Sequence, residues 1–135
     1  MLQPMLTLML WTLLVALYLL ALRVRSVRRG EVSLGYFRLN SGPSAPSDRA
    51  LAAARHYDNL FQVPVLFYLA CVTTLALGLN GPIALAWGFV VLRVIHGLIH
   101  LSYNNVRHRF AAFMAANLLL IAIWASIALQ LGSRG

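Results

Sequence analysis

Four long apolar stretches constrain the fold of this chain more than any other feature of its sequence. They cover about residues 5–22, 50–79, 82–103 and 110–131, and a helix of about 20 residues crosses a bilayer core of roughly 30 Å. The chain is 61% hydrophobic and only 10% charged, whereas soluble domains are about 25% charged. Since lipid cannot satisfy backbone polar groups, the spans should be helical. We therefore predict an all-α integral membrane protein, a four-helix bundle that forms one domain over residues 1–135.

The arginines predict how this bundle is oriented. The chain has 11 basic residues, all of them arginine, and most lie in the first connection, residues 23–49, and the third, residues 104–109. The second connection, residues 80–82, has none, and Arg134 is the one dissenting charge on the other side. Cytoplasmic loops carry the excess of basic residues, so both termini should lie on the far side, an N-out and C-out topology. The net charge of +8 is then a topological signal, and we expect no nucleic-acid partner.

A polar stripe runs along the third apolar stretch. Its members are spaced three, four, four and three residues apart, which places them on one face of a helix. They are Arg93, His96, His100, Asn104 and Arg107. An arginine at the bilayer centre costs roughly 2.5–3.5 kcal/mol on insertion scales. We therefore expect this face to turn toward protein or a wet cavity.

The second stretch carries a matching polar face at its cytoplasmic end, formed by Arg55, Asn59 and Gln62. The two polar faces should lie at the same depth and line one cytoplasm-facing cleft. Its predicted lining is Arg55, Asn59, Gln62, Arg93, His96, His100, Arg107 and Arg109. Several arginines with few acids favour an anionic ligand. The alternative is that these arginines reach lipid headgroups or pair with Asp58 and Glu31.

His96 and His100 are separated by three residues, a spacing that can hold one metal ion. A metal site would need a third ligand, and the neighbouring arginines repel cations. We therefore expect no metal, and two histidines that make hydrogen bonds in a polar core.

Residues 55–68, RHYDNLFQVPVLFY, resemble the R-x-x-x-N-x-x-E…P motif of the MAPEG family, the membrane-associated proteins in eicosanoid and glutathione metabolism. Arg55, Asn59 and Pro64 match this motif, and Gln62 stands where the family has glutamate. The third stretch resembles the same family. Arg93 matches its buried arginine, with His96 three residues later, and His100 replaces the usual tyrosine. The family's catalytic arginine follows the first by fourteen or sixteen residues, and Arg107 and Arg109 occupy both places.

The resemblance implies a homotrimer that is surrounded by membrane lipids. The chain resembles a bacterial-type member of the family, which implies a location in the bacterial inner membrane. The resemblance further implies glutathione as co-substrate at the cytoplasmic side between subunits, and a lipophilic small-molecule substrate that enters from the bilayer. Conjugation, peroxide reduction and isomerisation all remain open, as does the physiological thiol. Between the two candidate catalytic residues we favour Arg107, because it continues the stripe, whereas Arg109 points there only if the chain bends.

Three functions compete at this point. The first is a thiol-dependent membrane transferase or peroxidase acting on lipophilic electrophiles. The second is a non-catalytic membrane subunit or scaffold that retains the fold, and the third is a proton or small-solute carrier that uses His96 and His100. The outer halves of the second and third spans, residues 71–79 and 82–92, carry no charged residue, which counts against the carrier.

Overall fold

The structure, a computed structural model, describes residues 1–42 and 44–133, and its regular elements are all helices. These are α1 (Leu2–Arg28), α2 (Tyr36–Leu39), α3 (Asp48–Leu60), α4 (Val63–Ala76), α5 (Ile83–Leu101) and α6 (Val106–Gly132). The predicted all-α class is confirmed. Helices α3 and α4 together form the second span, and Arg134 lies outside the described residues.

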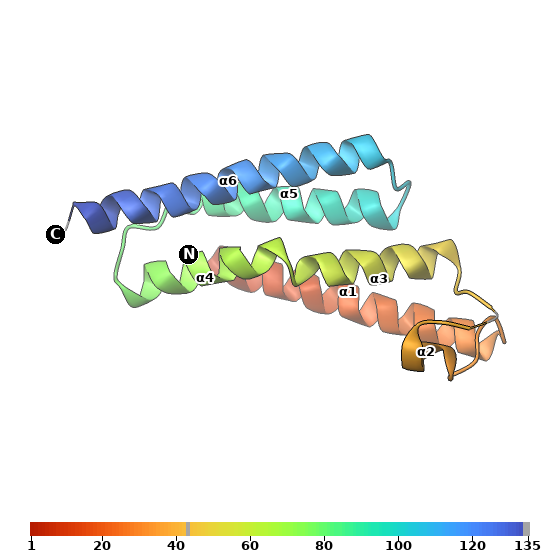
Figure 1. Ribbon diagram of the computed structural model, residues 1–135. Coiled ribbons are helices and arrows are strands. Elements are labelled where there is room, and N and C mark those ends of the chain that lie inside the picture. Colours follow the sequence, from red (N-terminus) through yellow and green to blue (C-terminus); the bar gives the residue numbers. More distant parts are fainter. Residues whose placement is uncertain (43, 134–135) are drawn as a thin grey trace.

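The four spans lie side by side along one direction (Figure 1). Helices α5 and α6 form one antiparallel pair, and α1 packs beside the α3–α4 pair. The start of α1, the end of α6 and the α4–α5 connection lie at one end of the bundle, and the α1–α3 and α5–α6 connections lie at the other (Figure 1). The two arginine-bearing connections therefore share an end, as the charge pattern requires.

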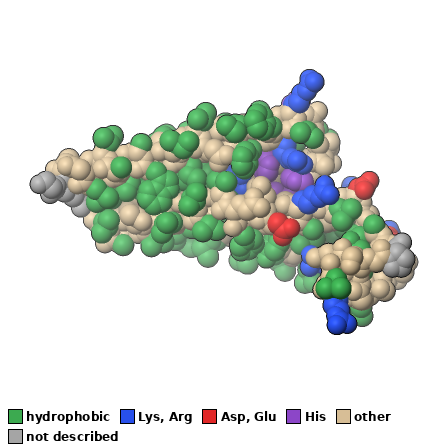
Figure 2. Space-filling model, viewed as in Figure 1, with side chains coloured by type: hydrophobic (Ala, Val, Ile, Leu, Met, Phe, Trp, Pro, Cys, Tyr) green, Lys and Arg blue, Asp and Glu red, His purple; other side chains and the backbone are tan. Residues whose placement is uncertain are grey.

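The inside and outside of the bundle are both apolar, as in a protein solvated by lipid. Phe67 of α4 and Phe89 of α5 are fully buried, and their rings stack with centroids 4.5 Å apart. On the outside, Leu17, Leu118 and Leu129 are 62–76% exposed, and Figure 2 shows apolar side chains spread over the visible face. Among the described residues, four spans are long and apolar enough to cross a membrane. The chain is thus an integral, multi-pass membrane protein.

The second span is interrupted ahead of Pro64. Helix α3 ends at Leu60 and α4 begins at Val63. A proline ring clashes with the carbonyl four residues earlier and offers no N–H to it. Here that carbonyl belongs to Leu60, the last residue of α3, so the break falls where the proline demands it.

The third and fourth spans meet at a different place from the one we predicted. Helix α5 ends at Leu101 rather than near residue 103, and α6 begins at Val106 rather than near residue 110. Asn104 adopts the left-handed conformation with φ of 48°, which asparagine tolerates better than most residues. Asn105 then caps α6, because its Oδ1 accepts from the N–H groups of Arg107 and His108 at 3.0 and 3.2 Å.

The first span also extends further than its apolar run. Helix α1 continues to Arg28, six residues past the predicted limit at residue 22. The second span begins with α3, close to its predicted start. The Ser47 side chain accepts a hydrogen bond from the Ala50 N–H at 3.4 Å and so caps this helix.

The orientation can be tested with single cysteines at Ser44 and Asn80, in a background where Cys71 is alanine. We expect Ser44→Cys to react with an impermeant thiol reagent from the cytoplasmic side only, and Asn80→Cys from the opposite side only, because the arginine-rich connections stay inside. Labelling of intact and inverted vesicles measures this. Reaction of both cysteines from one side, or the reverse pattern, would contradict the topology.

Candidate functional site

Arg93 of α5 lies at the centre of the candidate site, fully buried. Its Nη2 donates to the main-chain oxygen of Asn59 at 3.1 Å and also to the Asn59 side-chain Oδ1. Its Cζ lies 5.7 Å from the ring centroid of Phe113 on α6. Nε and Nη1 have no hydrogen-bond partner. Within the described chain the one ion pair joins Arg29 and Glu31 at 3.8 Å, so no carboxylate compensates the charge of Arg93.

The break before Pro64 makes the Asn59 main-chain oxygen available to this arginine. In an unbroken helix that oxygen would accept from the N–H of Val63, four residues on. Here it accepts from the Gln62 N–H at 3.3 Å and from Arg93. The proline thus converts a backbone carbonyl inside the membrane into an acceptor for a buried guanidinium.

Arg109 reaches the same region from the first turn of α6. Its Nη1 donates to Asn104 Oδ1 at 2.7 Å and lies 3.2 Å from His100 Nε2. A guanidinium only donates, so His100 Nε2 must accept, and a neutral His100 carries its proton on Nδ1. The left-handed turn at Asn104 is what returns Arg109 toward α5.

An open cleft of about 250 Å³ lies between α3, α5 and α6. It is lined by Asn59, His96, Val106, Arg109, Phe110 and Phe113. Arginine and histidine side chains gather on this face, toward the end that holds the arginine-bearing connections (Figure 2). The cleft has a cationic, hydrogen-bonding side and an apolar side, which suits a ligand with an anionic part and a lipophilic part.

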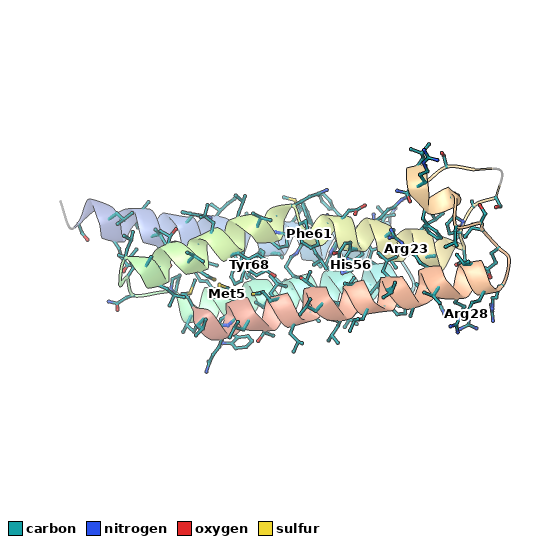
Figure 3. All side chains as sticks on the ribbon, turned by 90° about the horizontal axis from the view of Figure 1, so that it is seen from below. Met5, Arg23, Arg28, His56, Phe61 and Tyr68 are labelled. Atoms are coloured by element: carbon teal, nitrogen blue, oxygen red, sulfur yellow. The ribbon has the colours of Figure 1, made fainter. Side chains whose placement is uncertain are left out.

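A cluster of three imidazoles lies behind the cleft. His56 of α3 is fully buried, with ring centroids 5.7 Å from His96 and 5.5 Å from His100, and it points inward from α3 toward α1 (Figure 3). Both of its ring nitrogens, and Nδ1 of the other two, lack partners. Among the described residues no group of three or more His, Cys, Asp or Glu is arranged to hold a metal ion.

Sequence reasoning did not single out His56, which lies between Arg55 and Asp58 in the chain. The available signal was helical spacing, because Ala53, His56 and Leu60 share one face, and all three are buried. Gly97 is the second signal: a Cβ there would lie 2.5 Å from His56 Nε2 and 2.7 Å from a ring carbon of Trp11. A glycine at this point lets α1, α3 and α5 approach closely.

The structure brings five of the eight predicted site residues together, namely Asn59, Arg93, His96, His100 and Arg109. The expected continuation of the stripe to Arg107 is wrong, because α5 ends at Leu101, and the Arg107 side chain is exposed. Gln62 is exposed at the break. Arg55 is exposed and lines a separate hollow of about 270 Å³ with Arg23 and Asp58.

Fold and site together define a membrane-embedded helix bundle with a cationic cleft at the end that carries its basic connections. The model of the MAPEG family matches residues 1–129, and the chain belongs to this family of membrane proteins in eicosanoid and glutathione metabolism. No curated protein matches the sequence at a significant level. No solved structure does either.

The close approach at Gly97 gives a stability test. Gly97→Ala should destabilise the fold by about 1–3 kcal/mol, because the new methyl group meets the rings of His56 and Trp11. Gly88→Ala is the matched control: its Cβ would meet only the tip of the Leu119 side chain, at 2.8 Å, which can rotate away. Denaturant unfolding in detergent measures both. Equal stabilities for the two variants would show that the imidazole cluster is not tightly packed.

Proposed function

We propose that the protein binds glutathione, or a closely similar anionic thiol, in the cleft and joins it through its sulfur to lipophilic electrophiles or uses it to reduce lipophilic peroxides. The observation that carries the proposal is the uncompensated charge of Arg93. A buried charge is costly unless it is paired and hydrogen-bonded. An anionic ligand held in the adjoining cleft would offset this charge electrostatically and so lower that cost.

The binding roles follow from donor geometry. Arg109 lines the cleft, and Arg93 lies behind Asn59 and His96, two of the residues that line it. Guanidinium groups form paired, charge-assisted hydrogen bonds with carboxylates, and glutathione carries two carboxylates. Asn59 and His96 add neutral polar contacts. Gln62 in place of glutamate offers less attraction to the ammonium group of glutathione, so the carboxylates should contribute most of the affinity.

For catalysis we assign the main role to Arg109 rather than Arg107. The thiolate is the nucleophile, and a cation held beside the sulfur favours it. Arg109 is held by Asn104 and His100 and faces the cleft, whereas Arg107 is exposed. In the conjugation step the thiol proton leaves to water at the cleft mouth, the sulfur bonds to the electrophilic carbon, and that carbon's leaving group or π bond takes the displaced electron pair.

The lipophilic substrate would occupy the apolar side of the cleft. Phe110 and Phe113 line it, and Phe110 is 62% exposed on the outer surface of α6. A substrate dissolved in the bilayer could therefore reach the sulfur without crossing water. We further propose the bacterial inner membrane as the location, with the cleft open to the cytoplasm where the thiol is abundant.

Calorimetric titration tests the binding half of the proposal. Glutathione should bind the purified protein in detergent, and 2-mercaptoethanol, which lacks carboxylates, should give no measurable heat at the same concentration. Asn59→Ala should weaken glutathione binding, because it removes one of the oxygens that hold Arg93. Absence of glutathione binding to the wild-type protein would favour the non-catalytic scaffold.

Kinetics of Arg109→Ala and Arg107→Ala test the catalytic half. Loss of one positioned donor to a developing anion costs roughly 2.7–4 kcal/mol, so Arg109→Ala should lower kcat by on the order of a hundredfold. Because Arg109 also lines the cleft, the same variant should bind the thiol more weakly. Arg107→Ala removes the same charge from an exposed place and should keep wild-type turnover. The reverse ranking would return the role to Arg107. Unchanged turnover in both variants would mean that neither arginine acts on the sulfur.

We also propose a homotrimer, which rests on the family resemblance and on a cleft that is open in the single subunit. Native mass spectrometry in mild detergent should show three protomers. A monomer that retained full activity would refute the proposal that neighbouring subunits complete the site.

A further inference from the structure

The outer face of the last turns of α1 carries an apolar stripe that ends in arginines. Its members are Leu17, Leu20, Val24 and Arg28, spaced three, four and four apart, and they lie opposite the buried residues Val15, Leu19 and Ser26. All four stripe residues are exposed. Figure 3 shows Arg28 near the end of α1, on the side away from α3.

Two hollows flank this outer stripe of α1 and share three of its residues. One, of about 520 Å³, is lined by Leu17, Leu20, Ala21, Val24, Arg25, Arg28 and Arg29. The other, of about 390 Å³, is lined by Leu20, Arg23, Val24, Val27, Arg28, Leu34 and Phe37. In the first hollow, the aliphatic residues lie nearer the middle of the bundle and the arginines lie toward the end of α1, so that it has an apolar part and a cationic rim. In the second, Arg23 and Arg28 lie among apolar residues of α1 and the following connection.

Within the described chain, one of the three arginines of this rim has a carboxylate partner. Arg29 pairs with Glu31 at 3.8 Å, and Arg23 lies over the ring of Phe37, with its Cζ 5.5 Å from the centroid. Arg25 and Arg28 make no ion pair among the described residues. Leu34, which walls the second hollow, is 77% exposed, an unusual setting for a leucine in a connection that faces only water.

The dimensions match one leaflet of a bilayer. From Leu17 to Arg28 the helix rises about 16 Å at 1.5 Å per residue, and half of a bilayer core of roughly 30 Å is about 15 Å. We propose that this face of α1 binds an anionic phospholipid, with an acyl chain along the outer stripe and the phosphate at Arg25 and Arg28. Lipid surfaces that carry net negative charge attract such juxtamembrane arginines. This inference does not depend on the activity of the cleft.

Native mass spectrometry in detergent, with added phosphatidylglycerol or phosphatidylcholine, tests the lipid site. The wild-type protein should retain phosphatidylglycerol in preference to phosphatidylcholine. Arg25→Gln with Arg28→Gln should weaken phosphatidylglycerol retention by about tenfold or more. The matched control is Arg38→Gln with Arg49→Gln, which removes the same charge at the same end of the protein from residues that line neither hollow. The control should behave like the wild type.

Two further arms separate the sources of a bound phosphate. Phosphatidylglycerol with six-carbon chains should bind more weakly than the long-chain lipid, and inorganic phosphate at the same concentration should not displace the long-chain lipid. The proposal would be overturned if both double variants lost phosphatidylglycerol equally, or if the wild-type protein retained phosphatidylglycerol and phosphatidylcholine equally. Displacement of the long-chain lipid by inorganic phosphate alone would also overturn it. Thermal melting of each variant ensures that only folded protein is compared.

Discussion

The hydrogen bonds between Arg93 and Asn59 are the interaction on which the rest of this structure depends. A guanidinium with no water contact needs acceptors, and no carboxylate in the described chain pairs with it. Asn59 supplies two oxygens, and the backbone oxygen is available because α3 ends at Leu60, about one turn before Pro64. The proline, the break, the asparagine and the arginine therefore form one unit that joins the second span to the third.

Most of the fold could be predicted from the sequence, because lipid permits few alternatives. Long apolar runs must be helices, a proline must break one of them, and arginine-rich connections must share a side. We misplaced the turn between α5 and α6, because the polar spacing that begins at Arg93 continues through Arg107 although the helix does not. The two consecutive asparagines contained the correct signal, since asparagine favours both the left-handed conformation and the N-cap.

The candidate site was harder to predict than the fold, because it depends on how close the helices approach. Whether Arg107 or Arg109 faces the cleft is decided by a turn of four residues, Ser102 to Asn105, which apolar periodicity does not describe. His56 follows Arg55 and precedes Tyr57 and Asp58, and these polar neighbours suggest that its side chain is exposed to solvent. Its side chain instead packs against Gly97. Only the pairing of a histidine on one helix with a glycine on another reveals the imidazole cluster, and that pairing is tertiary information.

The chain has arginine but no lysine, and arginine suits the contacts inside this bundle better than lysine would. Arg93 bonds two oxygens of Asn59 and faces the Phe113 ring, and Arg109 bonds an asparagine oxygen and an imidazole nitrogen at once. A planar guanidinium presents several donors in fixed directions and stacks on rings, whereas an ammonium group is a compact, strongly hydrated point charge. A lysine at position 93 would be a poorer match for the paired oxygens and would lose the ring contact. The same chemistry that keeps the connections on one side of the membrane thus also builds the interior of the cleft, and both concentrate positive charge at the end of the bundle where an anion would enter.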